Sequence, residues 1–91
     1  MSECCPGGFI TPRDAANIAL NYVYGMYRGW EWNMYRVGLR VVRVYRYGCV
    51  YNVLINVTLT SMLSVFNIGK TVRRTHHIQV DPCTGAVVGV A

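Results

Sequence analysis

The sequence predicts a two-layer α+β domain, in which one N-terminal helix packs on one face of a roughly four-stranded antiparallel sheet. Three patterns predict it: one helical apolar stripe near the start, alternating apolar residues after it, and a hairpin signal at the end. Because one amphipathic helix covers only one face of a sheet, we expect the second face to be open. The 91 residues form a single domain with a modest core, and residues 1–9 are expected to be flexible or irregular.

The helix is predicted over about residues 12–28. Thr11 is the expected N-cap, Pro12 occupies the first helical position, and Asp14 reaches back to the N-cap amide. The apolar stripe at helical spacing consists of Ala16, Ala19, Leu20, Val23 and Tyr27. Gly29 is expected to end the helix.

Two tryptophans follow in a short connector. Trp30 and Trp32 have the same parity, so they would share a face of an extended segment. We expect them to be core anchors under the helix, and a pair that stacks on a ligand is the alternative.

The strands are predicted from alternation of apolar residues. Tyr35–Tyr47 reads as a strand whose period slips at Val41–Arg43, which indicates a β-bulge. Tyr51–Leu59 alternates most regularly, as expected of a half-buried strand. Ser61–Lys70 is ambiguous between a strand extension and an irregular loop. A third strand, from about Val72 to Val80, follows this segment.

The C-terminal residues predict a hairpin. Asp81 caps the turn with its side chain, Pro82 presets φ, and Gly85 supplies a positive φ before a last strand over residues 86–90. In the strand before the turn, the adjacent His76 and His77 must point to opposite faces, so they cannot form a two-histidine metal pair. We expect His76 to be partly buried and hydrogen-bonded.

Four cysteines, Cys4, Cys5, Cys49 and Cys83, leave the redox state open. Unpaired or buried thiols fit the sequence, and so do one or two disulfides. The adjacent Cys4 and Cys5 are not expected to bond each other, whereas Cys49 and Cys83 pair if their two turns meet. There is no CxxC spacing, so we expect no metal site and no cofactor.

The composition is basic, with nine Lys and Arg residues against four Asp and Glu and a net charge of +5. Eight of the nine are Arg, which favours bidentate contacts with phosphate or carboxylate over a merely basic surface. Polar residues interrupt the most apolar stretch, residues 50–68, so no transmembrane segment is expected. The first residues lack the features of a secretory signal, which favours a cytoplasmic location.

Two motifs resemble the PepSY domains, small modules with a cystatin-like helix-on-sheet arrangement. Ile10-Thr-Pro-Arg-Asp-Ala-Ala-Asn-Ile-Ala-Leu20 looks like the opening I-T-x-x-x-A helix of that family. Tyr51-Asn-Val-Leu-Ile-Asn-Val57 and Ile78-Gln-Val-Asp-Pro-Cys-Thr-Gly-Ala-Val-Val88 look like its strand and terminal hairpin. The resemblance implies a non-enzymatic module with a peptidase-inhibiting or regulatory role, and it assigns no catalytic residues.

No paired carboxylates and no phosphate-binding glycine loop are evident, so we expect no enzymatic activity. The expected binding surface is the open face of the sheet, where three polar rows lie side by side. These rows contain Arg36, Arg40, Asn52, Asn56, Thr58, Arg73, Thr75, His77 and Gln79. Such a surface suits an acidic protein or a nucleic acid, and an ordinary solvated face is the alternative.

The sequence therefore predicts a non-catalytic protein-interaction module that acts through the open face or an edge of the sheet. Its expected partner is a peptidase or an acidic protein. A small nucleic-acid-binding protein that uses the Arg rows is the alternative function. An open edge strand such as Tyr35–Tyr47 also predicts a homodimer with a continuous sheet.

Overall fold

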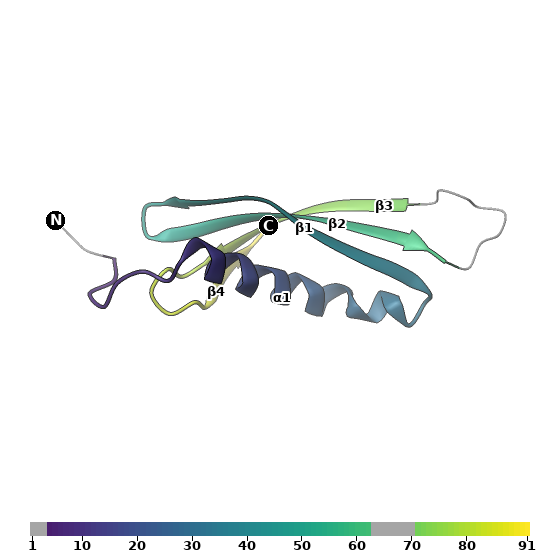
Figure 1. The fold of residues 1–91 in the computed structure, drawn as a ribbon, viewed down its shortest axis with the longest axis horizontal. Helices are drawn as coiled ribbons and strands as arrows, with labels where there is room; N and C mark the ends of the chain where they lie inside the picture. Colours follow the sequence, from purple (N-terminus) through teal and green to yellow (C-terminus); the bar gives the residue numbers. More distant parts are fainter. Residues whose placement is uncertain (1–3, 63–70) are drawn as a thin grey trace.

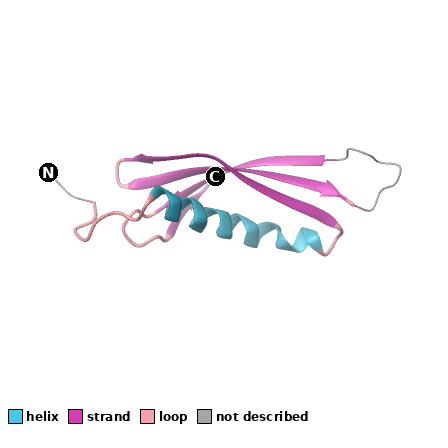
Figure 2. Cartoon of the chain, in the orientation of Figure 1, coloured by secondary structure: helices cyan, strands magenta, loops and turns pink. Residues whose placement is uncertain are grey.

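The computed structural model describes residues 4–62 and 71–91, and it confirms the predicted α+β architecture (Figure 1). In chain order the elements are α1 (Pro12–Glu31), β1 (Tyr35–Tyr47), β2 (Val50–Ser61), β3 (Thr71–Val80) and β4 (Val87–Val90). The strands form one antiparallel sheet in the order β1-β2-β3-β4, and α1 lies along one face of it (Figure 2). Most of the ambiguous segment Ser61–Lys70 lies outside the described residues.

Helix α1 begins as predicted and ends later than predicted. Thr11 is the N-cap, and its hydroxyl accepts a hydrogen bond from the backbone N–H of Asp14 at 3.1 Å. The helix continues through Gly29 to Glu31, and the chain reverses at Met34 with a φ of 62°. A terminating glycine adopts a positive φ, which Gly29 does not, so the expected stop at Gly29 is wrong. No helix among the described residues is long and apolar enough to cross a membrane.

This longer helix separates the two tryptophans. Trp30 packs in the last turn, with its ring centroid 5.1 Å from that of Tyr35 in an edge-on arrangement. Trp32 follows the helix and is 87% exposed. Because an α-helix turns by about 200° over two residues, side chains that share a face in an extended chain point apart here. The expectation that both tryptophans anchor the core is therefore wrong for Trp32.

The core lies between α1 and the inner face of the sheet. Every fourth residue of α1 is buried from Ala15 to Tyr27, and the small Ala15 and Ala19 let the helix approach the strands closely. Alternate residues of β2 and β3 complete the core: Tyr51, Val53, Ile55, Val57, Leu59, Ile78 and Val80. The regular alternation predicted for β2 is thus confirmed.

The predicted bulge in β1 is present. The pairing with β2 shifts between Val41, which faces Ile55, and Arg43, which faces Leu54. The extra residue is Val42, and it is exposed. Because of this shift, Val41 and Val44 both face the helix, while Arg43 joins the open face.

The N-terminal segment covers the end of the sheet that the helix does not reach. Its described residues, from Cys4 to Ile10, have no regular secondary structure, but they are held in place. The Tyr51 hydroxyl donates a hydrogen bond to the carbonyl oxygen of Ile10 at 2.8 Å. The Ile10 N–H donates to the carbonyl oxygen of Pro82, also at 2.8 Å. The Arg46 guanidinium lies 4.2 Å from the centroid of the Phe9 ring, in cation–π geometry.

Two disulfides fasten this segment to the sheet. Cys4 bonds to Cys49 in the β1–β2 turn, and Cys5 bonds to Cys83 in the β3–β4 turn. The predicted Cys49–Cys83 pairing is therefore wrong, although the two turns do lie at the same end of the sheet. Adjacent residues project in different directions, so Cys4 and Cys5 reach one turn each.

The β3–β4 turn follows the prediction. Asp81 Oδ1 accepts hydrogen bonds from the N–H groups of Cys83 and Thr84, at 2.7 and 3.1 Å. Gly85 has a φ of 80° and donates its N–H to the Asp81 carbonyl oxygen at 2.9 Å. The two N–H donors stabilise the carboxylate and hold the pKa of Asp81 below its usual range.

Removing either disulfide is expected to lower the free energy of unfolding by about 2–4 kcal/mol, because each closes a long loop in the unfolded chain. The loss should be greater for Cys5→Ala/Cys83→Ala than for Cys4→Ala/Cys49→Ala, since the sequence separations are 78 and 45 residues. Urea titration under non-reducing conditions measures the loss. Mass spectrometry of unreduced proteolytic peptides maps the bonds, and a Cys49–Cys83 peptide would contradict the pairing.

Substituting Asp81→Asn is expected to lower Tm at neutral pH and to have less effect in acid. The folded-state pKa of Asp81 is depressed, so its stabilising effect is complete above the unfolded-state pKa and is lost as pH falls through the folded-state value. The unfolded-state value is close to 3.8. Thermal unfolding of both proteins between pH 2 and pH 7 tests this, and a Tm difference that persists unchanged at low pH would refute it.

Candidate functional site

The nine predicted binding residues all lie on the open face of the sheet. In an antiparallel sheet, residues directly opposite each other project on the same side. The register places Arg40, Asn56 and Thr75 in one row across β1, β2 and β3, and Gly38, Thr58 and Arg73 in the next. The remaining predicted residues of this face are Arg36, Asn52, His77 and Gln79.

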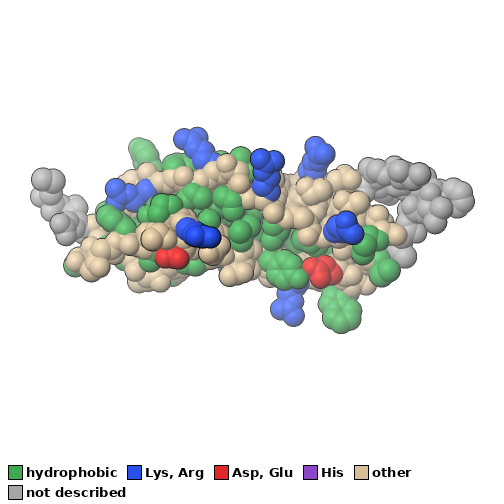
Figure 3. Space-filling model, viewed as in Figure 1, with side chains coloured by type: hydrophobic (Ala, Val, Ile, Leu, Met, Phe, Trp, Pro, Cys, Tyr) green, Lys and Arg blue, Asp and Glu red, His purple; other side chains and the backbone are tan. Residues whose placement is uncertain are grey.

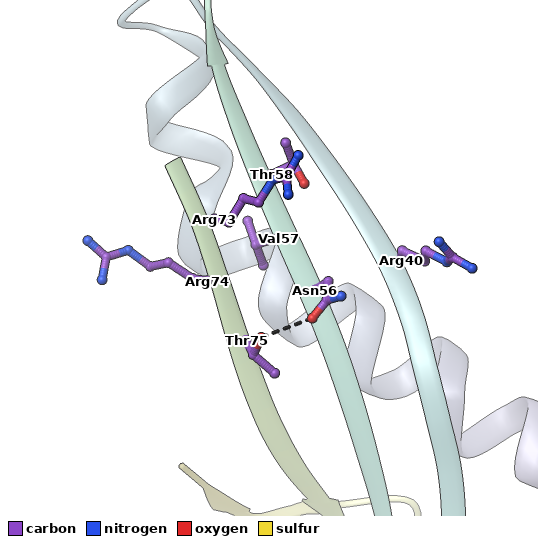
Figure 4. A pocket seen from close by; sticks show the side chains of 7 residues that line it. All are labelled: Arg40, Asn56, Val57, Thr58, Arg73, Arg74 and Thr75. Atoms are coloured by element: carbon purple, nitrogen blue, oxygen red, sulfur yellow. Dashed lines mark hydrogen bonds between the residues drawn. The ribbon is translucent and has the colours of Figure 1, made fainter. Parts of the chain in front are cut away.

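A shallow hollow of about 390 Å³ lies over the middle of this face (Figure 4). β2 forms its floor with Asn56 and Thr58, and β1 and β3 flank it. Its lining residues are Arg40, Asn56, Val57, Thr58, Arg73, Arg74 and Thr75. Gly38 has no side chain to fill the space beside Thr58, so the floor stays open toward β1.

The sheet is cationic without any acidic residue of its own. Four arginines belong to β1 and two to β3, whereas none of the four strands contains Asp or Glu. The acidic residues of the described segments are Asp14 and Glu31 in α1 and Asp81 in a turn. In Figure 3 the arginine side chains are distributed along the described part of the molecule, while the acidic side chains lie at the level of the helix. The open face therefore offers arginines that no acidic neighbour on the sheet neutralises.

Several polar side chains of the face are already engaged. The His77 Nε2 donates to Asn52 Oδ1 at 2.6 Å, and Asn52 is only 5% exposed. The Thr75 hydroxyl donates to Asn56 Oδ1 at 2.9 Å, on the exposed surface. The Asn52–His77 pair thus belongs to the structural support of the sheet, whereas the arginines remain available to a partner.

The two histidines lie on opposite faces, as predicted. His76 faces α1, where its Nε2 hydrogen-bonds with the hydroxyl of the buried Tyr27, and their ring centroids are 5.4 Å apart. The predicted partly buried, hydrogen-bonded His76 is thereby confirmed. Within residues 4–62 and 71–91, no three His, Cys, Asp or Glu side chains are grouped to hold a metal ion.

Two arginines near the site were not assigned to it from the sequence. Arg43 had no predicted direction, and the bulge turns it onto the open face, where its guanidinium lies 4.7 Å from the centroid of the Tyr45 ring. Arg74 belongs to the helix-facing set by parity, yet it is exposed and lines the hollow. Its side chain extends sideways past the edge of β3, and a charge in an otherwise apolar set is the sequence signal for such an edge position.

A second shallow surface, which was not predicted from the sequence, lies at the end of α1. Tyr24, Arg28, Glu31 and Trp32 line a hollow of about 410 Å³. The Tyr24 hydroxyl donates to Glu31 Oε1 at 2.8 Å, and this bond, together with the negative charge of Glu31, raises the pKa of Tyr24. The spacing of Tyr24, Arg28 and Trp32 at every fourth residue is the signal that places them on one side of the helix.

Comparisons with protein-family models, curated proteins and solved structures found no match to this chain.

Breaking the Asn52–His77 pair is expected to destabilise the fold. His77→Ala removes the donor and leaves the buried Asn52 oxygen unpaired, which costs about 1–3 kcal/mol. The double variant Asn52→Ala/His77→Ala should lose less stability than the sum of the losses in the two single variants, because each single variant breaks the same bond. Urea denaturation of the four proteins measures the coupling. Thr75→Ala, which removes an exposed bond, is the control expected to change stability less, and strictly additive losses would contradict the pairing.

Proposed function

We propose that the protein is a non-catalytic interaction module that binds an acidic segment of a partner protein on the open face of its sheet. The observation that carries the proposal is the separation of charge: the strands contain six arginines, four of them on the open face, and no acidic residue. Arg40 and Arg73 flank the central hollow, and Arg36 lies two residues before Gly38 on the same face. Guanidinium groups bind carboxylates in a bidentate manner, which suits Asp and Glu side chains.

The expected affinity follows from the exposure of these arginines. An exposed ion pair contributes about 0.2–1 kcal/mol, so three such pairs give at most about 3 kcal/mol. Binding by charge alone is therefore weak and falls as salt screens the charges. Any tighter binding must add hydrogen bonds or burial to the ion pairs.

The resemblance of the opening helix and the terminal hairpin to PepSY domains supports a non-enzymatic module of this kind. By that resemblance, a peptidase is one candidate partner, and inhibition or regulation of it is the expected effect. The two disulfides support action in an oxidising compartment, where such bonds persist, in preference to the cytoplasm of a mesophilic cell.

A nucleic acid is the alternative ligand. Tyr45 and Tyr47 lie on the open face with Arg43, and aromatic rings beside arginines suit stacking of bases. The central strand, however, presents Asn52, Leu54 and Asn56 there instead of aromatic rings. An acidic protein is therefore the better supported partner. A homodimer through the free edge of β1 stays a prediction.

The triple variant Arg36→Ala/Arg40→Ala/Arg73→Ala should bind poly-glutamate at least about threefold more weakly than the native protein at low salt, because it loses three ion pairs. Fluorescence anisotropy with labelled poly-glutamate and with a labelled single-stranded oligonucleotide compares the two ligand classes. The control is Arg13→Ala/Arg28→Ala, since both residues are exposed on α1.

Native protein that fails to bind poly-glutamate at low salt would refute the proposal, and so would an equal loss in the control variant. Tighter binding of the oligonucleotide, lost in the triple variant, would favour the alternative. A fall in the activity of a peptidase on addition of the native protein would identify the partner class that the resemblance implies.

A further inference from the structure

The outer edge of β3 is only half covered. β4 pairs with Ile78–Val80, and beyond it Ala91 exchanges both backbone hydrogen bonds with His77, at 3.0 and 2.9 Å. Among the described residues, no strand pairs with the outer edge of residues 71–76. Six residues of a strand span about 20 Å, which is long enough to receive a short extended peptide.

The register shows which backbone groups this free edge presents. His77 directs its N–H and C=O outward, to Ala91. In an antiparallel ladder the direction alternates with a period of two, so Thr75 and Arg73 also direct their N–H and C=O groups outward. An incoming strand that continues the line of β4 would therefore exchange backbone hydrogen bonds with Arg73 and Thr75.

Cationic side chains flank this edge on both faces of the sheet. Arg73 projects on the open face, where it leans over Thr58, and Arg74 extends sideways beyond β3, on the side away from β2 (Figure 4). Both residues are exposed. A strand placed against this edge would have Arg74 beside it, and Arg73, on the open face, would reach it by turning away from Thr58.

The other free edge is less suited to receive a strand. β1 is interrupted by the bulge at Val42, which breaks the regular spacing of its backbone groups. A bulge is a common means of blocking an edge strand. The pairing of β3 with β2 is regular from Thr71 to Val80, so the free half of β3 keeps the spacing that a new strand requires.

We infer that the free half of the β3 edge binds an extended acidic peptide of a partner protein as a fifth strand, antiparallel to β3. Directly opposite residues share a face, so the peptide residue opposite Arg74 contacts Arg74, and the next residue contacts Arg73. The recognised feature is therefore a pair of consecutive acidic residues within an extended segment. This inference rests on the proposed function and adds to it a binding mode and a register. In this mode, main-chain hydrogen bonds supply the affinity that exposed ion pairs lack.

The probe is the fluorescein-labelled peptide Val-Thr-Asp-Glu-Val-Thr, which places Asp opposite Arg74 and Glu opposite Arg73. Two N-methylated forms make a matched pair. Methylation of the Glu nitrogen removes a donor that points toward β3, so binding should weaken at least about tenfold. The Asp nitrogen points away from β3, so its methylation should change the dissociation constant by less than about twofold.

Fluorescence anisotropy with the full native chain measures these constants. Arg73→Ala and Arg74→Ala should each weaken binding, and Arg13→Ala on α1 should not. On addition of the peptide, the amides of Arg73 and Thr75 should exchange with solvent more slowly by nuclear magnetic resonance. A control peptide carries Asn-Gln in place of Asp-Glu, and its failure to bind would support the role of the acidic pair.

The failures of the two proposals are distinguishable. If the peptide binds but both methylated forms bind equally and no amide in β3 gains protection, the strand addition is refuted, and binding by the charged face stands. If neither this peptide nor poly-glutamate binds at low salt, the proposed function fails and the inference fails with it.

Discussion

The structure depends on how a single helix and a short N-terminal segment together cover one face of a longer sheet. α1 has 20 residues and spans about 30 Å, whereas the 13 residues of β1 span about 43 Å. The segment that begins at Cys4 covers the end near the two turns, and the two disulfides hold it there. Little of this segment is buried apart from Cys5, so covalent bonds supply the attachment that hydrophobic burial does not.

Because α1 covers only one face of the sheet, the other face is polar and cationic. With no second layer, the outer face of the sheet remains in water, and its strands alternate apolar residues inward with polar residues outward. The outward charges of the strands are arginines, while the acidic residues of the described segments lie in α1 and one turn. Arg74 is exposed although it belongs to the inward set, because its side chain extends sideways past the edge of β3 (Figure 4). The exposed face and the half-covered edge of β3 therefore meet at one cationic region.

Much of the fold followed from local patterns, since these patterns act over a few residues. Thr11 and Asp14 mark the helix start through a bond between near neighbours, and the turn at Asp81 closes in the same way. The alternation along β2 predicts its inner face because the side-chain period of a strand is two. The open-face residues could be predicted for the same reason. The end of α1 could not, because packing of Trp30 against Tyr35 favours a further helical turn over the stop at Gly29.

The element order, the helix cap, the bulge in β1 and the two faces of each strand can be read from local sequence patterns, because each depends on residues close together in the chain. The pairing of the cysteines, the position of Trp32 and the placement of Arg73 and Arg74 beside an edge that no described strand covers follow from the three-dimensional arrangement. These features depend on contacts between residues that are distant in sequence. The Cys5–Cys83 bond, which joins residues 78 positions apart, is the clearest case: its partners meet only after the sheet has brought both turns to one end.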